Sequence, residues 1–181
     1  MIETKTLIDA CVFAADKHKF QRRKGCLKIP YINHPLKVCK ILIDCGESDT
    51  DLLVAAVLHD TVEDTDTSFT EIKERYNAHV ANLVGEVKDN KTLSYAERKA
   101  LQIKKAPGLS DNAKKLKIAD KICNINDMVT YPINWPDARK HAYIDWSVMV
   151  FEGCKGINNM LDRLFSDTIE NAKKQLRVTR E

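Results

Sequence analysis

No stretch of this 181-residue sequence approaches the roughly 20 consecutive apolar residues that a membrane-spanning helix needs. Residues 1–5 carry an early acid and lead into no apolar signal core, so we expect no secretory signal. The net charge of +3 is too small to demand a polyanionic partner, although it is compatible with a small anionic substrate. We therefore expect neither a membrane nor a nucleic acid as partner.

Pairs of the C-x-x-C type are also missing, although the chain contains six cysteines. They are Cys11, Cys26, Cys39, Cys45, Cys123 and Cys154. Several fall on apolar faces of expected helices, where a reduced thiol behaves as a small apolar side chain. This usage disfavours disulfides and a cysteine-based zinc site, and it favours a reducing compartment. We expect the protein to be cytoplasmic.

Strand signals are nearly absent, whereas helical periodicity, capping residues and helix breakers recur. Helices are expected at residues 4–18, 35–46, 52–59, 69–77, 78–87, 95–107, 110–131, 143–151 and 157–176. The third is expected to be interrupted near Thr61–Thr67, and Asn77 to close the fourth in a left-handed conformation. Because there is no repeat, linker or low-complexity tract, the sequence predicts one all-α domain over residues 1–181.

The apolar run at residues 52–58 ends abruptly in titratable side chains. These are His59, Asp60, Glu63 and Asp64. Buried charges of this kind cost several kcal/mol, by order of magnitude, unless they pair or bind a metal. A continuous helix would place His59 and Glu63 one turn apart, and likewise Asp60 and Asp64. His59 and Asp60 can converge on one cation only if other segments complete its ligand shell.

Two residues elsewhere could complete such a shell. They are His34, in a Tyr-Ile-Asn-His-Pro run, and Asp120, in a Lys-Ile-Ala-Asp-Lys run. Two imidazoles and two carboxylates without a thiolate favour a divalent ion such as Mn²⁺, Fe²⁺ or Zn²⁺. Glu63 and Asp64 would remain to orient and deprotonate a water. Taken singly, His34 could be a turn histidine and Asp120 a solvated helix residue.

A basic segment, residues 17–28, precedes His34. In this segment Arg23 could bind a phosphate group through two hydrogen bonds, and Lys24 could attract one as a point charge. The alternatives are a solvated loop, a nuclear-import patch or a weak nucleic-acid contact.

Three later residues could contact a substrate. Arg98 is a candidate for a phosphate contact, although a solvated helix face is the default for its surroundings. Asn124 lies four residues after Asp120 on the same helical face, so it could donate to a base or sugar or be a buried capping amide. Tyr143 could line the pocket, although core packing is the default.

Four of these runs together resemble the HD-domain hydrolases of the Rel/Spo family, which degrade the alarmone ppGpp. The matching runs are residues 23–24, 31–35, 58–65 and 117–121. The His-Asp pair alone is a weak motif, but the four runs in this order are highly specific. The resemblance covers nearly the whole chain and is closest to the small stand-alone animal members.

The resemblance implies a single all-α HD bundle in which His34, His59, Asp60 and Asp120 bind one Mn²⁺. It implies that Glu63 and Asp64 are the catalytic acid pair. It places Lys24 and Asn124 in the nucleotide pocket and Arg98 against the phosphates. Three positions depart from the family pattern. Asn77 replaces a usual glycine, Lys88 a common threonine, and Cys123 the tyrosine that the animal proteins tend to carry. None of the three is a proposed metal ligand.

The activity that follows is removal of the 3′-pyrophosphate of ppGpp, without a synthetase domain. Two alternatives stay open. The same site could act as an NADPH 2′-phosphatase, since animal relatives are associated with that activity. The basic segment could instead serve a non-catalytic nucleotide- or RNA-binding module, although an intact set of site residues argues against this.

Overall fold

The computed structural model describes residues 3–178, and in that range its only β-pairing is an isolated bridge between Arg22 and Pro30. The helices are α1 (Thr4–Lys17), α2 (Asn33–Asp44), α3 (Thr50–Leu58), α4 (Thr61–Asp64), α5 (Phe69–Arg75), α6 (Ala78–Val87), α7 (Tyr95–Lys105), the 3-10 helix η1 (Ala106–Gly108), α8 (Asp111–Thr130), α9 (Asp137–Glu152) and α10 (Asn159–Val178). The all-α prediction is confirmed. No described helix is long and apolar enough to cross a bilayer.

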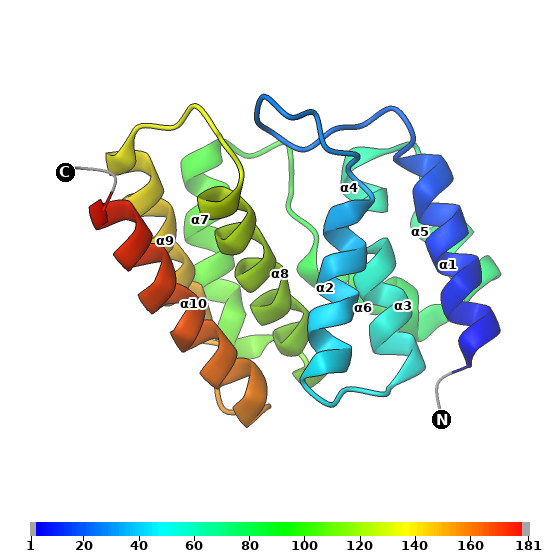
Figure 1. Ribbon diagram of the computed structural model, residues 1–181. Coiled ribbons are helices and arrows are strands. Elements are labelled where there is room, and N and C mark those ends of the chain that lie inside the picture. The colour runs from blue at the N-terminus through cyan, green and yellow to red at the C-terminus, as the bar shows by residue number, and fades with distance from the viewer. Residues whose placement is uncertain (1–2, 179–181) are drawn as a thin grey trace.

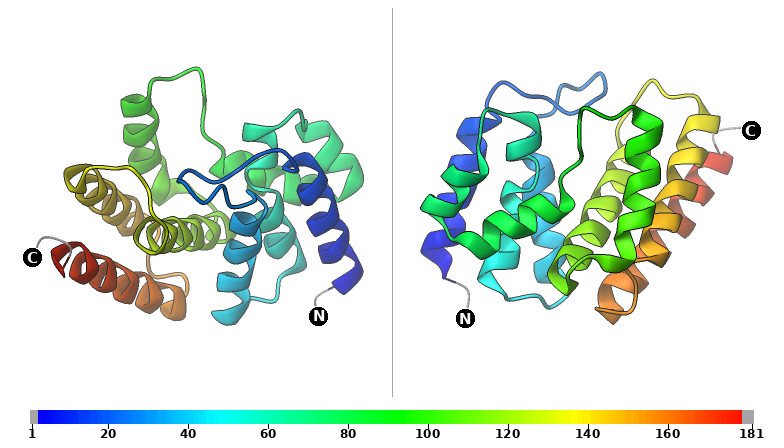
Figure 2. Two further views of the ribbon diagram at one scale, coloured as in Figure 1. Left: turned by 45° about the horizontal axis from the view of Figure 1, so that its top comes forward. Right: turned by 180° about the vertical axis from the view of Figure 1, so that it is seen from behind.

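Two helices, α3 and α8, organise the core. Every residue from Leu52 to Leu58 on α3 is buried, because α1, α2 and α6 all pack around this helix. Helix α8 packs against α2 on one side and α10 on the other (Figure 1). In the two further views α7, α9 and α10 lie together beyond α8, and α1 to α6 lie on its other side (Figure 2). One connected apolar core therefore runs through both groups.

Helix α3 ends earlier than the sequence predicted. It stops at Leu58, and the short helix α4 starts at Thr61, so His59 and Asp60 lie in the break between them. The hydroxyl of Thr61 donates to the carbonyl of Leu58 at 2.7 Å, which satisfies a helix-end acceptor that a continuing helix would have bonded. His59 keeps helical backbone angles of φ −57° and ψ −31°, whereas Asp60 departs from them with φ −96° and ψ −7°.

The conformation predicted for Asn77 was wrong. Its φ is −176°, so the backbone is extended rather than left-handed. Asn77 caps the start of α6, where its side chain accepts the amide of Val80 at 2.9 Å, instead of closing α5. An asparagine serves either helix end, and the sequence did not distinguish them. Gly46, by contrast, has φ +86° just after α2, as a helix-ending glycine should.

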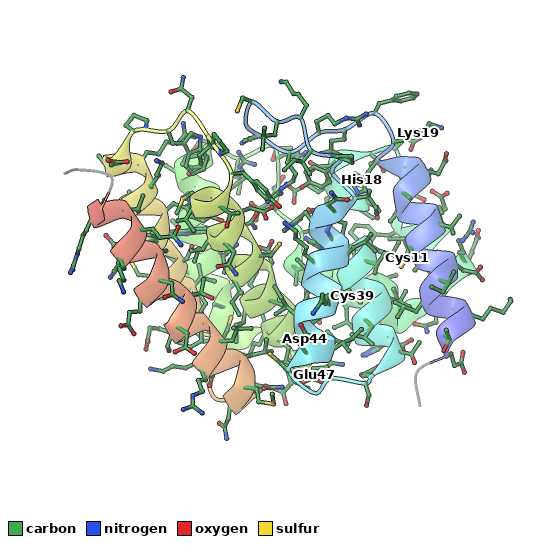
Figure 3. All side chains as sticks on the ribbon, viewed as in Figure 1. Cys11, His18, Lys19, Cys39, Asp44 and Glu47 are labelled. Carbon is green, nitrogen blue, oxygen red and sulfur yellow. The ribbon has the colours of Figure 1, made fainter. Side chains whose placement is uncertain are left out.

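Two other boundaries differ. Helix α2 begins two residues before Pro35, and α9 begins directly after Pro136 rather than near Tyr143. The second difference is the larger, because residues 137–142 are mostly polar and gave no apolar periodicity. All six cysteines are free thiols, including Cys11 on α1 and Cys39 on α2 (Figure 3).

Candidate active site

A pocket of about 550 Å³ opens at one end of the helices. Its walls come from residues 21–31, the start of α2, the break between α3 and α4, residues 87–91, and helices α7, α8 and α9. Every residue that the sequence proposed for the site lines it. These are His34, His59, Asp60, Asp120, Glu63, Asp64, Arg23, Lys24, Arg98, Asn124 and Tyr143.

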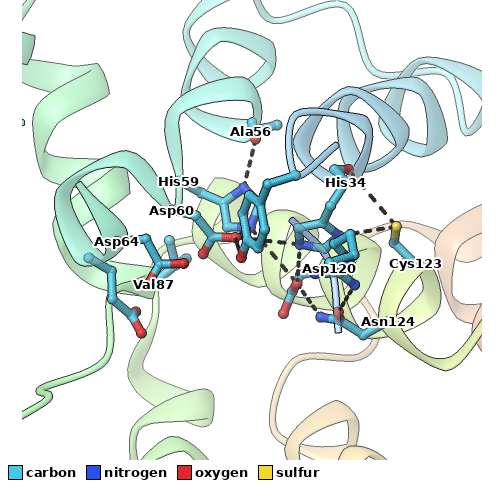
Figure 4. A network of polar contacts seen from close by, with 12 residues as sticks. His34, Ala56, His59, Asp60, Asp64, Val87, Asp120, Cys123 and Asn124 are labelled. Atoms are coloured by element: carbon cyan, nitrogen blue, oxygen red, sulfur yellow. Dashed lines mark hydrogen bonds and ion pairs between the residues drawn. The ribbon is translucent and has the colours of Figure 1, made fainter. Parts of the chain in front are cut away.

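The proposed metal ligands converge at the base of the pocket (Figure 4). Nε2 of His34 lies 3.2 Å from Asp120 Oδ1 and 3.6 Å from Asp60 Oδ2. Nε2 of His59 lies 3.2 Å from Asp60 Oδ2 and 3.9 Å from Asp120 Oδ1. The two histidines come from α2 and the break after α3, and Asp120 comes from α8. Segments far apart in the chain thus bring ligand atoms of His34, His59 and Asp120 together, and Asp60 lies beside both histidines.

The chemistry of this cluster fits a divalent cation. Ligand atoms of His34, His59 and Asp120 lie within 4.8 Å of one another. Nε2 of His59 is buried and has no hydrogen-bond partner among the described residues. Its Nδ1 lies 2.7 Å from the carbonyl of Ala56, the arrangement that leaves Nε2 bare in a ligating histidine. An orphaned nitrogen facing two carboxylates is the environment a cation completes.

The electrostatics of the cluster agree with that fit. Burial favours the neutral ring of His59, yet the carboxylates of Asp60 and Asp120 raise its pKa to about 9. Burial likewise opposes the charged form of Asp60, but His59 and His34 hold the pKa of that carboxyl well below its usual range. Both carboxylates are therefore ionised at neutral pH, and positive charge is favoured between them.

The ligands are held by neighbouring side chains. The hydroxyl of Tyr31 donates to Asp60 Oδ2 at 2.7 Å. The amide of Asn124 donates to Asp120 Oδ1 at 2.6 Å. The thiol of Cys123 lies 3.2 Å from Nδ1 of His34. Such outer contacts fix ring and carboxylate orientation before a metal binds.

The two remaining acids lie on α4, beside the cluster. Glu63 Oε2 accepts the backbone amide of Asp89 at 2.9 Å, and burial raises the pKa of Glu63. Asp64 accepts the Nε2 of Gln21 at 2.9 Å and also pairs with Lys91. Both carboxylates remain within the pocket wall, where a carboxylate can accept a proton from water.

The residues proposed to contact substrate differ in whether their side chains already bond to the rest of the protein. Arg23 is engaged by the protein, since Nη2 donates to Asn124 Oδ1 at 2.7 Å and lies 3.1 Å from Asp127 Oδ2. Asn124 is thereby bonded at both ends of its amide, which matches the buried-amide alternative. Lys24 is exposed at the rim. Nε of Arg98 is buried without a hydrogen-bond partner among the described residues.

Several pocket residues were missed by the sequence reasoning. Gln21, Tyr31, Asp89 and Lys121 line the same pocket and bond to the residues named above. Tyr31 and Lys121 stand inside the runs that carried His34 and Asp120, so their proximity could have been inferred. For Gln21 the sequence holds no comparable signal.

Three comparisons bear on this site. The chain matches the HD-domain family over residues 10–141. It is 47% identical to the guanosine-3′,5′-bis(diphosphate) 3′-pyrophosphohydrolase MESH1 of Xenopus tropicalis, over 89% of this chain and 93% of that protein. For the protein of the same name from Homo sapiens the identity is 45%, over 88% and 90%.

The fold has solved counterparts. One is described as "A metazoan ortholog of SpoT hydrolyzes ppGpp and plays a role in starvation responses". It superposes with a TM-score of 0.88 at 37% identity, covering 92% of this chain and 94% of the other. A second, lmo0812 from Listeria monocytogenes EGD-e, gives a TM-score of 0.64 at 28% identity, covering 80% and 96%.

Proposed function

The chain belongs to the HD-domain family, and from this membership we propose that its pocket hydrolyses guanosine 3′,5′-bis(diphosphate), ppGpp, at the 3′-diphosphate. The single observation that carries the proposal is the convergence of four ligand atoms beside two further acids in one pocket. Relatives that match over most of their length bear the name of this activity.

The reaction adds one water and releases two products. The ester to the 3′-oxygen is broken, which gives GDP with a free 3′-hydroxyl and inorganic pyrophosphate. Glu63 and Asp64 orient the attacking water and accept its proton, because both are carboxylates in the pocket wall next to the cluster. Gln21 and Lys91 fix the direction of the Asp64 carboxylate.

His34, His59, Asp60 and Asp120 hold the metal, which we propose to be one Mn²⁺ per chain. Two carboxylates and two imidazoles without a thiolate suit this ion. When bound, the cation supplies Lewis acidity and neutralises phosphate charge. Lys24 and Arg98 stabilise further negative charge on the phosphates. Lys24 is an exposed cation at the rim, and Nε of Arg98 is buried without a hydrogen-bond partner among the described residues.

The test is an assay of the purified protein with Mn²⁺, offered ppGpp and NADPH in separate reactions, with the phosphate products identified. We expect GDP and pyrophosphate from ppGpp. Glu63→Gln should keep the metal and lose about 10²–10⁴-fold in kcat, since it removes a general base. Glu74→Gln, an exposed acid on α5, is the matched control and should leave kcat unchanged. A protein that loads Mn²⁺ and yields no pyrophosphate contradicts the proposal.

The alternatives named for the sequence gain no support here. No observation favours NADPH over ppGpp, so the 2′-phosphatase remains a prediction that the same assay tests. If the protein were a non-catalytic nucleotide- or RNA-binding module, the same assay would detect no phosphate release. We also propose that residues 1–181 act as one domain in the cytoplasm, supported by the single connected core and the six free thiols.

A further inference from the structure

One lysine in the pocket wall is placed unlike its neighbours. Lys99 extends from α7 toward α9, and its Nζ lies 3.2 Å from the centroid of the Trp146 ring. The rings of Tyr143 and Tyr95 lie 4.6 and 5.1 Å from the same nitrogen. Three aromatic rings thus surround one ammonium group, and the indole nitrogen of Trp146 donates to the carbonyl of Lys99 at 3.1 Å. These ring contacts restrict the conformations of the Lys99 side chain.

The ammonium nitrogen of Lys99 is buried and has no hydrogen-bond partner among the described residues. Three other lysines of the pocket are engaged. Lys117 donates to the carbonyl of Val87 at 2.8 Å, Lys121 pairs with Asp120, and Lys91 pairs with Asp64. Aromatic faces attract a cation but leave its three N–H donors unused. A buried ammonium with unused donors facing a pocket is the environment that an anion completes.

The charged groups that act on Lys99 are two cations and one acid. Lys121, and Arg139 more weakly, act on Lys99 from α8 and α9, and Asp89 acts in the opposite sense. Burial, together with Lys121, lowers the pKa of Lys99 to about 7. Such a group gains from a bound anion both charge compensation and hydrogen bonds.

Lys99 also lies close to the metal cluster. The Nζ atoms of Lys99 and Lys121 both lie within 4.5 Å of the Trp146 ring centroid, and Lys121 contacts Asp120 at 3.0 Å. An anion on Lys99 would therefore sit one aromatic ring away from the residues that hold the metal. Lys99 and the cluster line the same pocket, so one nucleotide bound there can present phosphates to both.

We propose that Lys99, in its cage of Tyr95, Tyr143 and Trp146, is a substrate-binding residue that holds a phosphate group of the nucleotide. The inference rests on the proposed function and deepens it, since it assigns a specificity-determining contact. The phosphate belongs either to the 5′-diphosphate or to the leaving 3′-diphosphate. Both offer the same chemistry, a multiply charged oxyanion.

The experiment separates these two sources. Calorimetry measures the Kd of ppGpp, of GDP, which carries only the 5′-diphosphate, and of guanosine 3′-diphosphate, all with the Mn²⁺-loaded Glu63→Gln protein so that turnover is suppressed. Lys99→Met removes the charged atom and keeps an unbranched side chain of nearly the same length, and Lys99→Arg restores the charge. Lys104→Met, an exposed lysine on the same helix, is the matched control.

We expect Lys99→Met to weaken ppGpp binding by about tenfold or more, because a charge-assisted hydrogen bond is lost. The loss should recur with GDP if Lys99 holds the 5′-diphosphate, and with guanosine 3′-diphosphate if it holds the leaving group. Lys99→Arg should recover part of it, and Lys104→Met should match the parent. Unchanged Kd values for all three nucleotides overturn the proposal, as does equal weakening by Lys104→Met.

A second readout excludes a purely structural role. Because Lys99 is partly neutral near pH 7, anion binding should take up a proton, seen as a dependence of the binding heat on the ionisation enthalpy of the buffer. Lys99→Met should abolish that uptake. A wild-type protein that binds GDP through Lys99 but does not cleave ppGpp would contradict the proposed function and leave the anion site standing.

Discussion

The thiol of Cys123 and the imidazole of His34 meet on the side of the ring that faces away from the proposed metal. Sγ lies 3.2 Å from Nδ1, while Nε2 of the same ring points at Asp60 and Asp120 (Figure 4). Burial raises the pKa of the Cys123 thiol to about 12, so it is a neutral partner. A ligating histidine more often has a carboxylate or a carbonyl in this position.

Replacing Cys123 by Ala should therefore weaken metal binding about 10–100-fold, the usual cost of losing an outer contact to a ligand. Cys123→Ser keeps a polar atom and should recover part of the affinity. The measurement is competitive titration of Mn²⁺ against a chelator. Cys154→Ala removes another buried thiol, one with no hydrogen bond to a proposed metal ligand among the described residues, and should lower stability without changing the metal Kd. Equal metal affinity in all three variants would show that the thiol does not position His34.

His59→Ala should abolish both metal retention and turnover. It removes one of the four proposed ligands, the one that lies near both Asp60 and Asp120. Metal content by elemental analysis and kcat with ppGpp are the two measurements. Glu63→Gln separates the roles, since it should retain the metal at full stoichiometry. An active, metal-free His59→Ala protein would remove the mechanism.

Gln21 should act through Asp64. Its Oε1 lies 2.6 Å from Nδ1 of the buried His18, and this contact directs its Nε2 to Asp64. Gln21→Met should lower kcat about tenfold, because a hydrogen bond to a charged group is lost, while metal content and melting temperature stay the same. Gln21→Glu, which sets a second carboxylate against Asp64, should be worse. A change in KM alone would place Gln21 in substrate binding instead.

The pH profile should report the environment of Glu63. Burial raises the pKa of this carboxyl, and the charges of Asp60, Asp89 and Asp64 add to the effect. A general base must be ionised, so kcat/KM should fall as pH decreases through a value above the ordinary range of glutamate. Asp89→Asn removes one of those charges and keeps an oxygen for the Gln102 amide. It should move the acid limb to lower pH, and a shift in the opposite direction would argue against Glu63 as the base.

The sequence was most informative where chemistry is local. Polar residues at the end of a buried run marked His59 and Asp60 without any knowledge of packing. The break that turns these two side chains toward His34 was not foreseen at its position, because the hydroxyl of Thr61 that satisfies the end of α3 looks ordinary in sequence.

Relationships across the chain were beyond the sequence. Arg23 and Asn124 are 101 positions apart, and only the fold shows that they bond to each other rather than to a ligand. Lys99 belongs to a helix without a buried residue, so its periodicity suggested a solvated face. Two of the aromatic rings that enclose it come from α9, where core packing was the default for Tyr143 and pocket lining the alternative.

The pocket residues stand partly on helices of the core and partly on connecting segments, and this bears on how substrate specificity can change in evolution. The side chains aimed at the cation stand on α2, α8 and the break between α3 and α4, all anchored in the core. Lys24 and Lys91 are exposed and stand instead on connecting segments. Substitutions in those segments could therefore change the specificity of the enzyme toward a different phosphorylated metabolite, while the proposed metal-binding residues stay the same.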